Sequence, residues 1–174
     1  MKLAKGFLLV FIGLAIMITL FSLLIPSRVM TVRTVMIHAS PEKVFEQIAD
    51  LKNWKHWHPV FMQDSNLVQV SSPSSGVNAY AEWSTTGKKN KLLITGVEAN
   101  KLNLLLERPG ENSSNNIISV TAMPDSNAVQ AEWRVLTKLK WYPWEKFSGF
   151  FVEKITGAGY EAALNNLRTF VEGE

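Results

Sequence analysis

The side chains in this chain that could carry acid–base or metal chemistry are its three histidines, His38, His56 and His58. Imidazole titrates near neutral pH and is a common metal ligand. A metal site needs three or four ligands with supporting hydrogen bonds, and no cysteine or acidic cluster accompanies the histidines. We therefore expect no metal site and no cofactor. Proton transfer by a single histidine stays open, although the sequence offers it no evident partner carboxylate.

Aromatic side chains form the second group of candidates, with six Trp and nine Phe. Trp54 and Trp57 would pack a helical turn against a sheet or line a route for a ligand. Trp83 and Trp133 fall on apolar faces of predicted strands, where packing in a core and lining a cavity look identical in sequence. The glycine patterns of nucleotide-binding loops, the nucleophile elbow and the zinc-protease helix do not occur in the sequence.

The elements that must position these residues begin before His38. Ser40, followed by Pro41 and Glu42, predicts the start of a helix, because Ser caps free amides and Pro suits the first helical position. Apolar residues then recur at three- and four-residue intervals, at Val44, Phe45, Ile48 and Leu51. The β-branched residues 31–38 predict a strand, with one face formed by Val29, Thr31, Arg33, Val35 and Ile37.

This stretch resembles the opening of the START-like superfamily, which includes the polyketide cyclases and is also called SRPBCC. The matching residues are Ala39-Ser40-Pro41-Glu42-Lys43-Val44-Phe45, Ile48-Ala49-Asp50 and Trp54-Lys55-His56-Trp57-His58-Pro59. The resemblance covers about residues 30–172. It implies an α+β helix-grip fold, in which a curved antiparallel sheet wraps a long C-terminal helix with an apolar cavity between them. Members bind lipids, sterols, hormones or polyketides, and only some are catalysts.

Alternation and polar turns after Pro59 predict the strands of an antiparallel sheet. We expect them near residues 67–70, 77–85, 91–97, 102–107, 117–123 and 128–138, with a long exposed loop at 109–116. The dry face of such a sheet needs a cover. Apolar residues at helical spacing from Phe147 to Val171 predict a long helix that supplies it.

Gly157 and Gly159 stand in the middle of this predicted helix, where each costs up to about 1 kcal/mol relative to Ala. Either the helix bends there or another group approaches it closely. In the resembled fold the middle of the helix faces the cavity, so the glycines would leave room for a ligand; tight packing of helix on sheet is the alternative. The candidate cavity residues are Trp54, Trp57, Trp83, Trp133, Phe150, Gly157 and Tyr160.

A charge-free stretch precedes the domain, from Phe7 to Ile25. As a helix it would span roughly 28 Å, close to the thickness of a bilayer's hydrocarbon core. We expect residues 1–28 to form a membrane anchor with its flanks. A cleaved signal peptide is the alternative, but no small-residue cleavage pattern precedes Pro26. Lys2 and Lys5 favour a cytoplasmic N-terminus, which places a single-pass protein in a bacterial inner membrane with its soluble domain outside the cytoplasm.

The charge of the chain argues against nucleic-acid binding. Three of the 18 basic residues, Lys2, Lys5 and Arg28, flank the apolar stretch, while all 15 acidic residues lie beyond it. Residues 29–174, which form one domain, therefore carry no net charge, and a clustered basic face is not indicated. The absence of cysteine fits either side of a membrane.

The segment from Leu139 to Phe147 has the composition of a surface that meets a membrane. It holds three aromatic residues, Trp141, Tyr142 and Trp144, between lysines. In the resembled fold this connection lies near the mouth of the cavity, so an apolar ligand would be able to pass between bilayer and cavity. A lid that closes over the core is the alternative.

We therefore predict a membrane-anchored domain that binds an apolar small molecule or lipid. One alternative is a cyclase- or aromatase-type enzyme, for which Tyr160 and Glu82 are the side chains to examine as a paired acid and base. The other is an interaction or sensor module whose cavity is filled by its own side chains.

Overall fold

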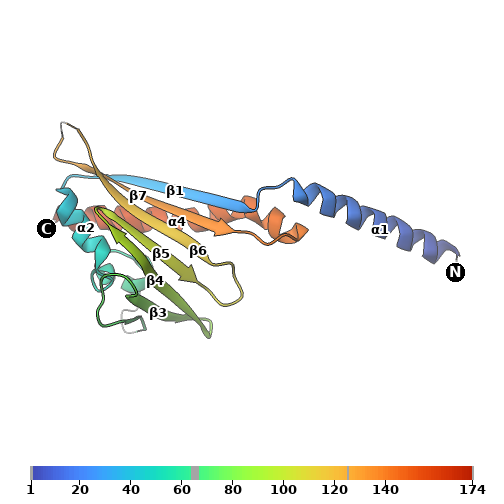
Figure 1. Cartoon of the computed structure of the whole chain (residues 1–174), viewed down its shortest axis with the longest axis horizontal. Coiled ribbons are helices and arrows are strands. Elements are labelled where there is room, and N and C mark those ends of the chain that lie inside the picture. Colours follow the sequence, from blue (N-terminus) through green and yellow to red (C-terminus); the bar gives the residue numbers. More distant parts are fainter. Residues whose placement is uncertain (1, 64–66, 125, 174) are drawn as a thin grey trace.

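The computed structural model describes residues 2–63, 67–124 and 126–173. Helix α1 (Lys2–Leu23) projects from one end of an α+β domain (Figure 1). Its apolar side chains are exposed along its length. The helix ends slightly earlier than the predicted apolar stretch, and Leu24 and Ile25 follow it as a turn.

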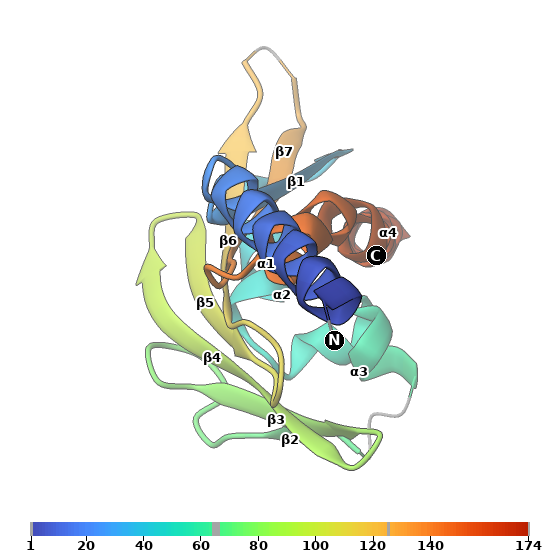
Figure 2. The same cartoon turned by 90° about the vertical axis from the view of Figure 1, so that its right-hand side faces the viewer.

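A seven-stranded antiparallel sheet forms the body of the domain, in the order β1-β7-β6-β5-β4-β3-β2. The strands are β1 (Arg28–Ile37), β2 (Gln69–Val70), β3 (Tyr80–Thr85), β4 (Lys88–Glu98), β5 (Lys101–Glu107), β6 (Ser114–Ala122) and β7 (Val129–Lys138). Successive strands from β2 to β7 are neighbours, and β1 lies at the edge of the sheet beside β7. The sheet curves from β1 to β2 around the side that carries the helices (Figure 2).

The predicted short helix is α2 (Pro41–Ala49), and the side-chain oxygen of Ser40 caps it by accepting a hydrogen bond from the Lys43 amide at 3.3 Å. A 3-10 turn η1 (Asn53–His56) and helix α3 (Pro59–Gln63) follow. The indole Nε1 of Trp54 donates to the Ile48 carbonyl at 2.9 Å, and that of Trp57 to the Gln47 carbonyl at 3.2 Å. Both rings are fully buried. The two tryptophans therefore fix η1 to the end of α2.

The long C-terminal helix is α4 (Pro143–Gly173), which continues through both central glycines. Its second half contributes Ala163, Leu164, Leu167 and Val171 to the core. Its first turns differ from the prediction, because Phe147, Phe150 and Phe151 are 42, 68 and 62% exposed. The apolar spacing is continuous, but the sheet covers only part of the helix.

The predicted loop at 109–116 is shorter than expected. Strand β6 already begins at Ser114, and both Ser114 and Asn116 are buried. The tight turn between β3 and β4 consists of Thr86 and Gly87, both with positive φ. The curved sheet and the helix on its concave side confirm the predicted helix-grip architecture.

Candidate functional site

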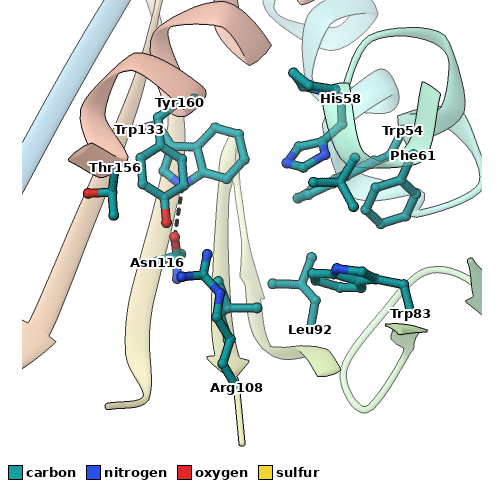
Figure 3. A pocket seen from close by; sticks show the side chains of 14 residues that line it. Trp54, His58, Phe61, Trp83, Leu92, Arg108, Asn116, Trp133, Thr156 and Tyr160 are labelled. Atoms are coloured by element: carbon teal, nitrogen blue, oxygen red, sulfur yellow. Dashed lines mark hydrogen bonds between the residues drawn. The ribbon is translucent and has the colours of Figure 1, made fainter. Parts of the chain in front are cut away.

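A cavity of about 280 Å³ lies between the sheet, the η1–α3 segment and the middle of α4 (Figure 3). Its walls are largely apolar. The aromatic ones come from Trp54 in η1, Phe61 in α3, Trp83 in β3 and Trp133 in β7. The η1–α3 segment, β3 and β7 are far apart in sequence, so the fold brings their rings together.

The aromatic rings contact one another around this space. The centroid of Trp54 is 5.4 Å from that of Phe61 and 5.8 Å from that of Trp133. Phe61 lies 6.0 Å from Trp83, and Tyr160 of α4 lies 5.0 Å from Trp133. Such spacings are those of mutually packed aromatic pairs, which hold the rings in place.

A hydrogen bond from Trp133 to Asn116 of β6 orients the Trp133 ring. The indole Nε1 of Trp133 donates to Asn116 Oδ1 at 3.1 Å. The amide nitrogen of Asn116 donates to the carbonyl and hydroxyl oxygens of Ser114, at 3.1 and 3.2 Å. The buried amide therefore has protein partners at both ends, and its role is to position Trp133.

His58 points into the cavity from the segment between η1 and α3 (Figure 3). Its ring stacks on Trp54, with centroids 5.1 Å apart. Its Nδ1 is buried and has no hydrogen-bond partner among the described residues. Burial lowers the pKa of His58 from 6.5 to about 3, because the charged imidazolium would lose its hydration. The imidazole is therefore neutral at physiological pH.

Tyr160 and Arg108 form a polar corner at the opposite wall. Burial raises the pKa of the Tyr160 hydroxyl, while the charge and hydrogen bonding of the Arg108 guanidinium act in the opposite direction. Arg108 Nη1 also donates to Glu111 Oε2 at 3.1 Å. Tyr160 stays protonated near neutral pH and can donate a hydrogen bond into the cavity.

The structure brings four of the seven predicted cavity residues to this site: Trp54, Trp83, Trp133 and Tyr160. Trp57 is buried behind Trp54, at a centroid distance of 4.8 Å, and does not line the cavity. Phe150 is exposed on the outside of α4. The ligand roles of these residues remain predictions.

The two central glycines of α4 have different surroundings. A Cβ on Gly157 would lie 2.2 Å from a guanidinium nitrogen of Arg33, whose side chain crosses the helix and pairs with Glu153 at 3.5 Å and Glu161 at 3.8 Å. A Cβ on Gly159 would meet nothing within 4 Å, and this residue lines the cavity. Gly157 thus accommodates a side chain of the domain itself, while Gly159 borders the open space.

The other two histidines lie elsewhere. His38 Nδ1 is 3.0 Å from Glu172 at the end of α4, and the exposed His56 ring stacks on Phe170 at 5.0 Å. Residues 2–63, 67–124 and 126–173 contain no group of three or more side chains that would hold a metal ion.

Sequence reasoning missed Arg108 and Asn116 and gave His58 no place in the cavity. Arg108 directly follows β5, and Asn116 lies within a polar run that reads as a loop. His58 belongs to the Trp-rich motif, so the resemblance offered a signal for it. Asn116 depends on its contact with Trp133 of β7, and Arg108 on its contact with Tyr160 of α4, and local sequence patterns reveal neither contact.

The cavity between a curved sheet and the C-terminal helix is the arrangement implied by the opening motif. A sequence profile described as "Polyketide cyclase / dehydrase and lipid transport" matches residues 28–172. The chain belongs to this polyketide cyclase and lipid transport family. No curated relative matches the chain.

Solved structures agree with the family assignment at the level of the fold. A truncated norcoclaurine synthase from Thalictrum flavum has a TM-score of 0.65 at 13% identity, and the match covers 86% of this chain and 98% of the synthase. A START superfamily protein from Mycobacterium smegmatis has a TM-score of 0.61 at 15% identity, covering 83% and 98%. A protein from Thermobifida fusca has a TM-score of 0.62 at 14% identity, covering 82% and 92%. These similarities show a START-like fold, and the profile match confirms the predicted family.

Proposed function

We propose that this family member is a membrane-anchored domain that binds an apolar small molecule in the cavity between the sheet and α4. The observation that carries the proposal is the cavity itself, with its aromatic walls and a small set of polar groups. Sites for small molecules are typically apolar hollows with few orienting polar groups.

The size of the cavity limits the ligand. Its volume of about 280 Å³ is near the lower end of the range of roughly 300–1,000 Å³ for small-molecule sites. An engineered cavity of about 150 Å³ already holds benzene. We infer a ligand with one or two rings, or a short acyl chain, rather than a whole two-chain lipid. Binding would draw mainly on buried apolar area.

A cyclase-type enzyme is the second candidate, because His58, Tyr160 and Arg108 place polar groups beside a bound molecule. The low pKa of His58, about 3, makes it a poor proton acceptor at neutral pH in the empty cavity. Glu82, which the enzyme alternative singled out for examination, is not among the cavity-lining residues. Binding without reaction is therefore the better supported function. The open cavity likewise disfavours a module whose interior is filled.

Comparing the natural chain with a variant whose cavity is blocked tests the binding function. The full chain and Gly159→Leu would be extracted from their host membrane in polymer-bounded native discs. Small molecules would then be identified by mass spectrometry of the organic extract. We expect a compound present at near one per chain in the natural protein and depleted in G159L, because the added side chain enters space that is empty of protein atoms. Identical extracts from two folded proteins would refute the proposal.

Membrane anchoring is proposed for α1. The candidate span Ala4–Leu23 has a mean hydropathy of 2.6, and only 6% of it is buried, so it is not a core helix of the domain. Past its end, the buried Lys146 Nζ donates to the Ile25 carbonyl at 2.7 Å and to the Ser27 hydroxyl at 2.5 Å. We place the domain outside the cytoplasm of a bacterium. A C-terminal alkaline phosphatase fusion should be active and a fluorescent-protein fusion dark; the reverse pattern would contradict this orientation.

The aromatic segment at the start of α4 is the proposed contact with the bilayer surface. Trp141 and Trp144 are 67 and 70% exposed, and Tyr142 stacks on Trp144 with centroids 4.5 Å apart. This segment lies beside the end of α1 (Figure 1). Lipids brominated near the headgroup should quench the fluorescence of the full chain, and Trp141→Phe with Trp144→Phe should remove that quenching. If the double variant is quenched to the same extent, the segment does not touch the bilayer.

A further inference from the structure

The polar groups that face the cavity are not balanced in charge. Arg108 is the one residue with a formal charge among the described residues that line it. His58 is neutral near pH 7. The cavity thus has apolar walls and a single positive corner.

Several of the polar groups are already occupied. The Asn116 amide is bonded to Trp133 and Ser114, so it has little capacity left for a ligand. Arg108 differs, because a guanidinium has five N–H donors, and its hydrogen bonds to Glu111 and to the Tyr160 hydroxyl leave others unused. The Tyr160 hydroxyl lies beside the guanidinium and also donates (Figure 3). The positive corner therefore presents hydrogen-bond donors to the cavity.

Glu111 pairs with Arg108 at 3.1 Å from outside the cavity. Its side chain is 61% exposed, and it lines a neighbouring surface groove that Arg108 and Tyr160 also border. An ion pair that is exposed to water contributes little and is readily exchanged. A carboxylate of a ligand would meet the guanidinium, which is 36% exposed, from the cavity side, where the walls are largely apolar and charge-assisted hydrogen bonds are stronger.

Building on the proposed binding function, we infer that the cavity selects apolar ring compounds that carry an anionic group, bound by the Arg108 guanidinium and the Tyr160 hydroxyl. The ring would lie among the Trp and Phe side chains. A neutral analogue would keep the apolar contacts and lose the charge-assisted bonds. A cationic analogue would place its charge against the guanidinium.

Three compounds with the same rings test the inference: 1-naphthoate, naphthalene-1-methanol and 1-(aminomethyl)naphthalene. Each would be titrated into the full chain in lipid nanodiscs, with empty discs to correct for partition into lipid. The readout is the indole N–H resonance of Trp133, assigned through Trp133→Phe. We expect naphthoate to bind about tenfold or more tightly than the alcohol, because hydrogen bonds to charged groups are the stronger class. The amine should bind most weakly.

Variants at the charged corner separate this inference from the general binding function. Arg108→Gln should weaken naphthoate binding about tenfold and leave the alcohol unchanged, while Glu111→Gln should strengthen naphthoate binding. Arg134→Gln, an exposed Arg on β7, is the matched control. If R108Q fails to fold, E111Q still decides the question.

The outcomes are distinguishable. Equal affinity for the three compounds, or a naphthoate preference that survives R108Q or is unaffected by E111Q, refutes the selection of anions and leaves the binding function standing. No shift of the Trp133 resonance with any compound contradicts both proposals.

Discussion

The neutral, buried His58 predicts a specific dependence of stability on pH. Its folded pKa is about 3, whereas an unfolded chain has the ordinary value near 6.5. Between these values the unfolded state binds one proton that the folded state does not. Stability is therefore complete above about pH 6.5 and falls as the pH decreases, by about 1.4 kcal/mol per pH unit. At pH 5 the loss is about 2 kcal/mol, which is a substantial share of a typical domain's stability.

Replacing the imidazole with a ring that cannot titrate removes this loss. His58→Phe keeps ring contacts with Trp54, Trp57 and Phe61, and it eliminates the unpartnered nitrogen. At pH 7.5 we expect the variant to be at least as stable as the natural chain. From pH 6.5 to 5 the free energy of unfolding of the variant should not show the loss that the His58 imidazole causes in the natural chain.

Urea unfolding of the full chain in nonionic detergent, followed by circular dichroism at several pH values, measures the difference. Glu98 and Glu172 also have lowered pKa values, through Lys101 and His38 respectively. The contributions of these two carboxylates to stability are lost mainly below about pH 4.5, and they are the same in the natural chain and in H58F. His56→Phe, at an exposed ring, is the matched control. Parallel pH profiles for the natural chain and H58F would refute the assignment of a buried neutral imidazole.

Two further predictions concern α4. Gly159→Ala should stabilise the full chain by about 0.5–1 kcal/mol through its higher helix propensity, and it should weaken ligand binding because Gly159 lines the cavity. Gly157→Ala should gain less stability because its methyl group displaces Arg33. Equal effects of the two variants in unfolding and naphthoate titrations would contradict this difference. Lys146→Met should cost about 1–3 kcal/mol, since it removes two charge-assisted bonds, and should make residues 24–27 more accessible to protease. An unchanged cleavage rate would show that Lys146 does not fix this joint.

Much of the fold follows from local patterns in the sequence. The Ser40 cap, the apolar spacing of α2 and the alternation of the strands each predict an element that the structure contains. These signals are local, because capping and periodicity depend on residues within a few positions of one another. The resemblance of the opening motif to the START-like superfamily then supplies the arrangement of these elements in space.

The candidate site was less predictable, because its polar residues depend on distant partners. Asn116 reads as part of a loop, but it is buried because Trp133 of the adjacent strand donates to it. Phe150 has the spacing of a core residue, yet the sheet does not extend over it. The two glycines were interpreted together, and only the position of Arg33 distinguishes them. In each case the outcome depends on how separate elements lie in space, which local sequence patterns do not specify.

The joint between α1 and the domain sets how far the domain can reach. Only residues 24–27 separate α1 from β1, and the Leu139 amide donates to the Ser27 carbonyl at 2.9 Å beside the Lys146 bonds. If α1 spans a bilayer, no flexible linker separates it from the domain, and the domain keeps one orientation relative to the lipid surface. The domain would exchange its ligand only with the adjacent leaflet or with a protein that binds to it. Transfer of the ligand between two membranes would therefore require a separate soluble partner.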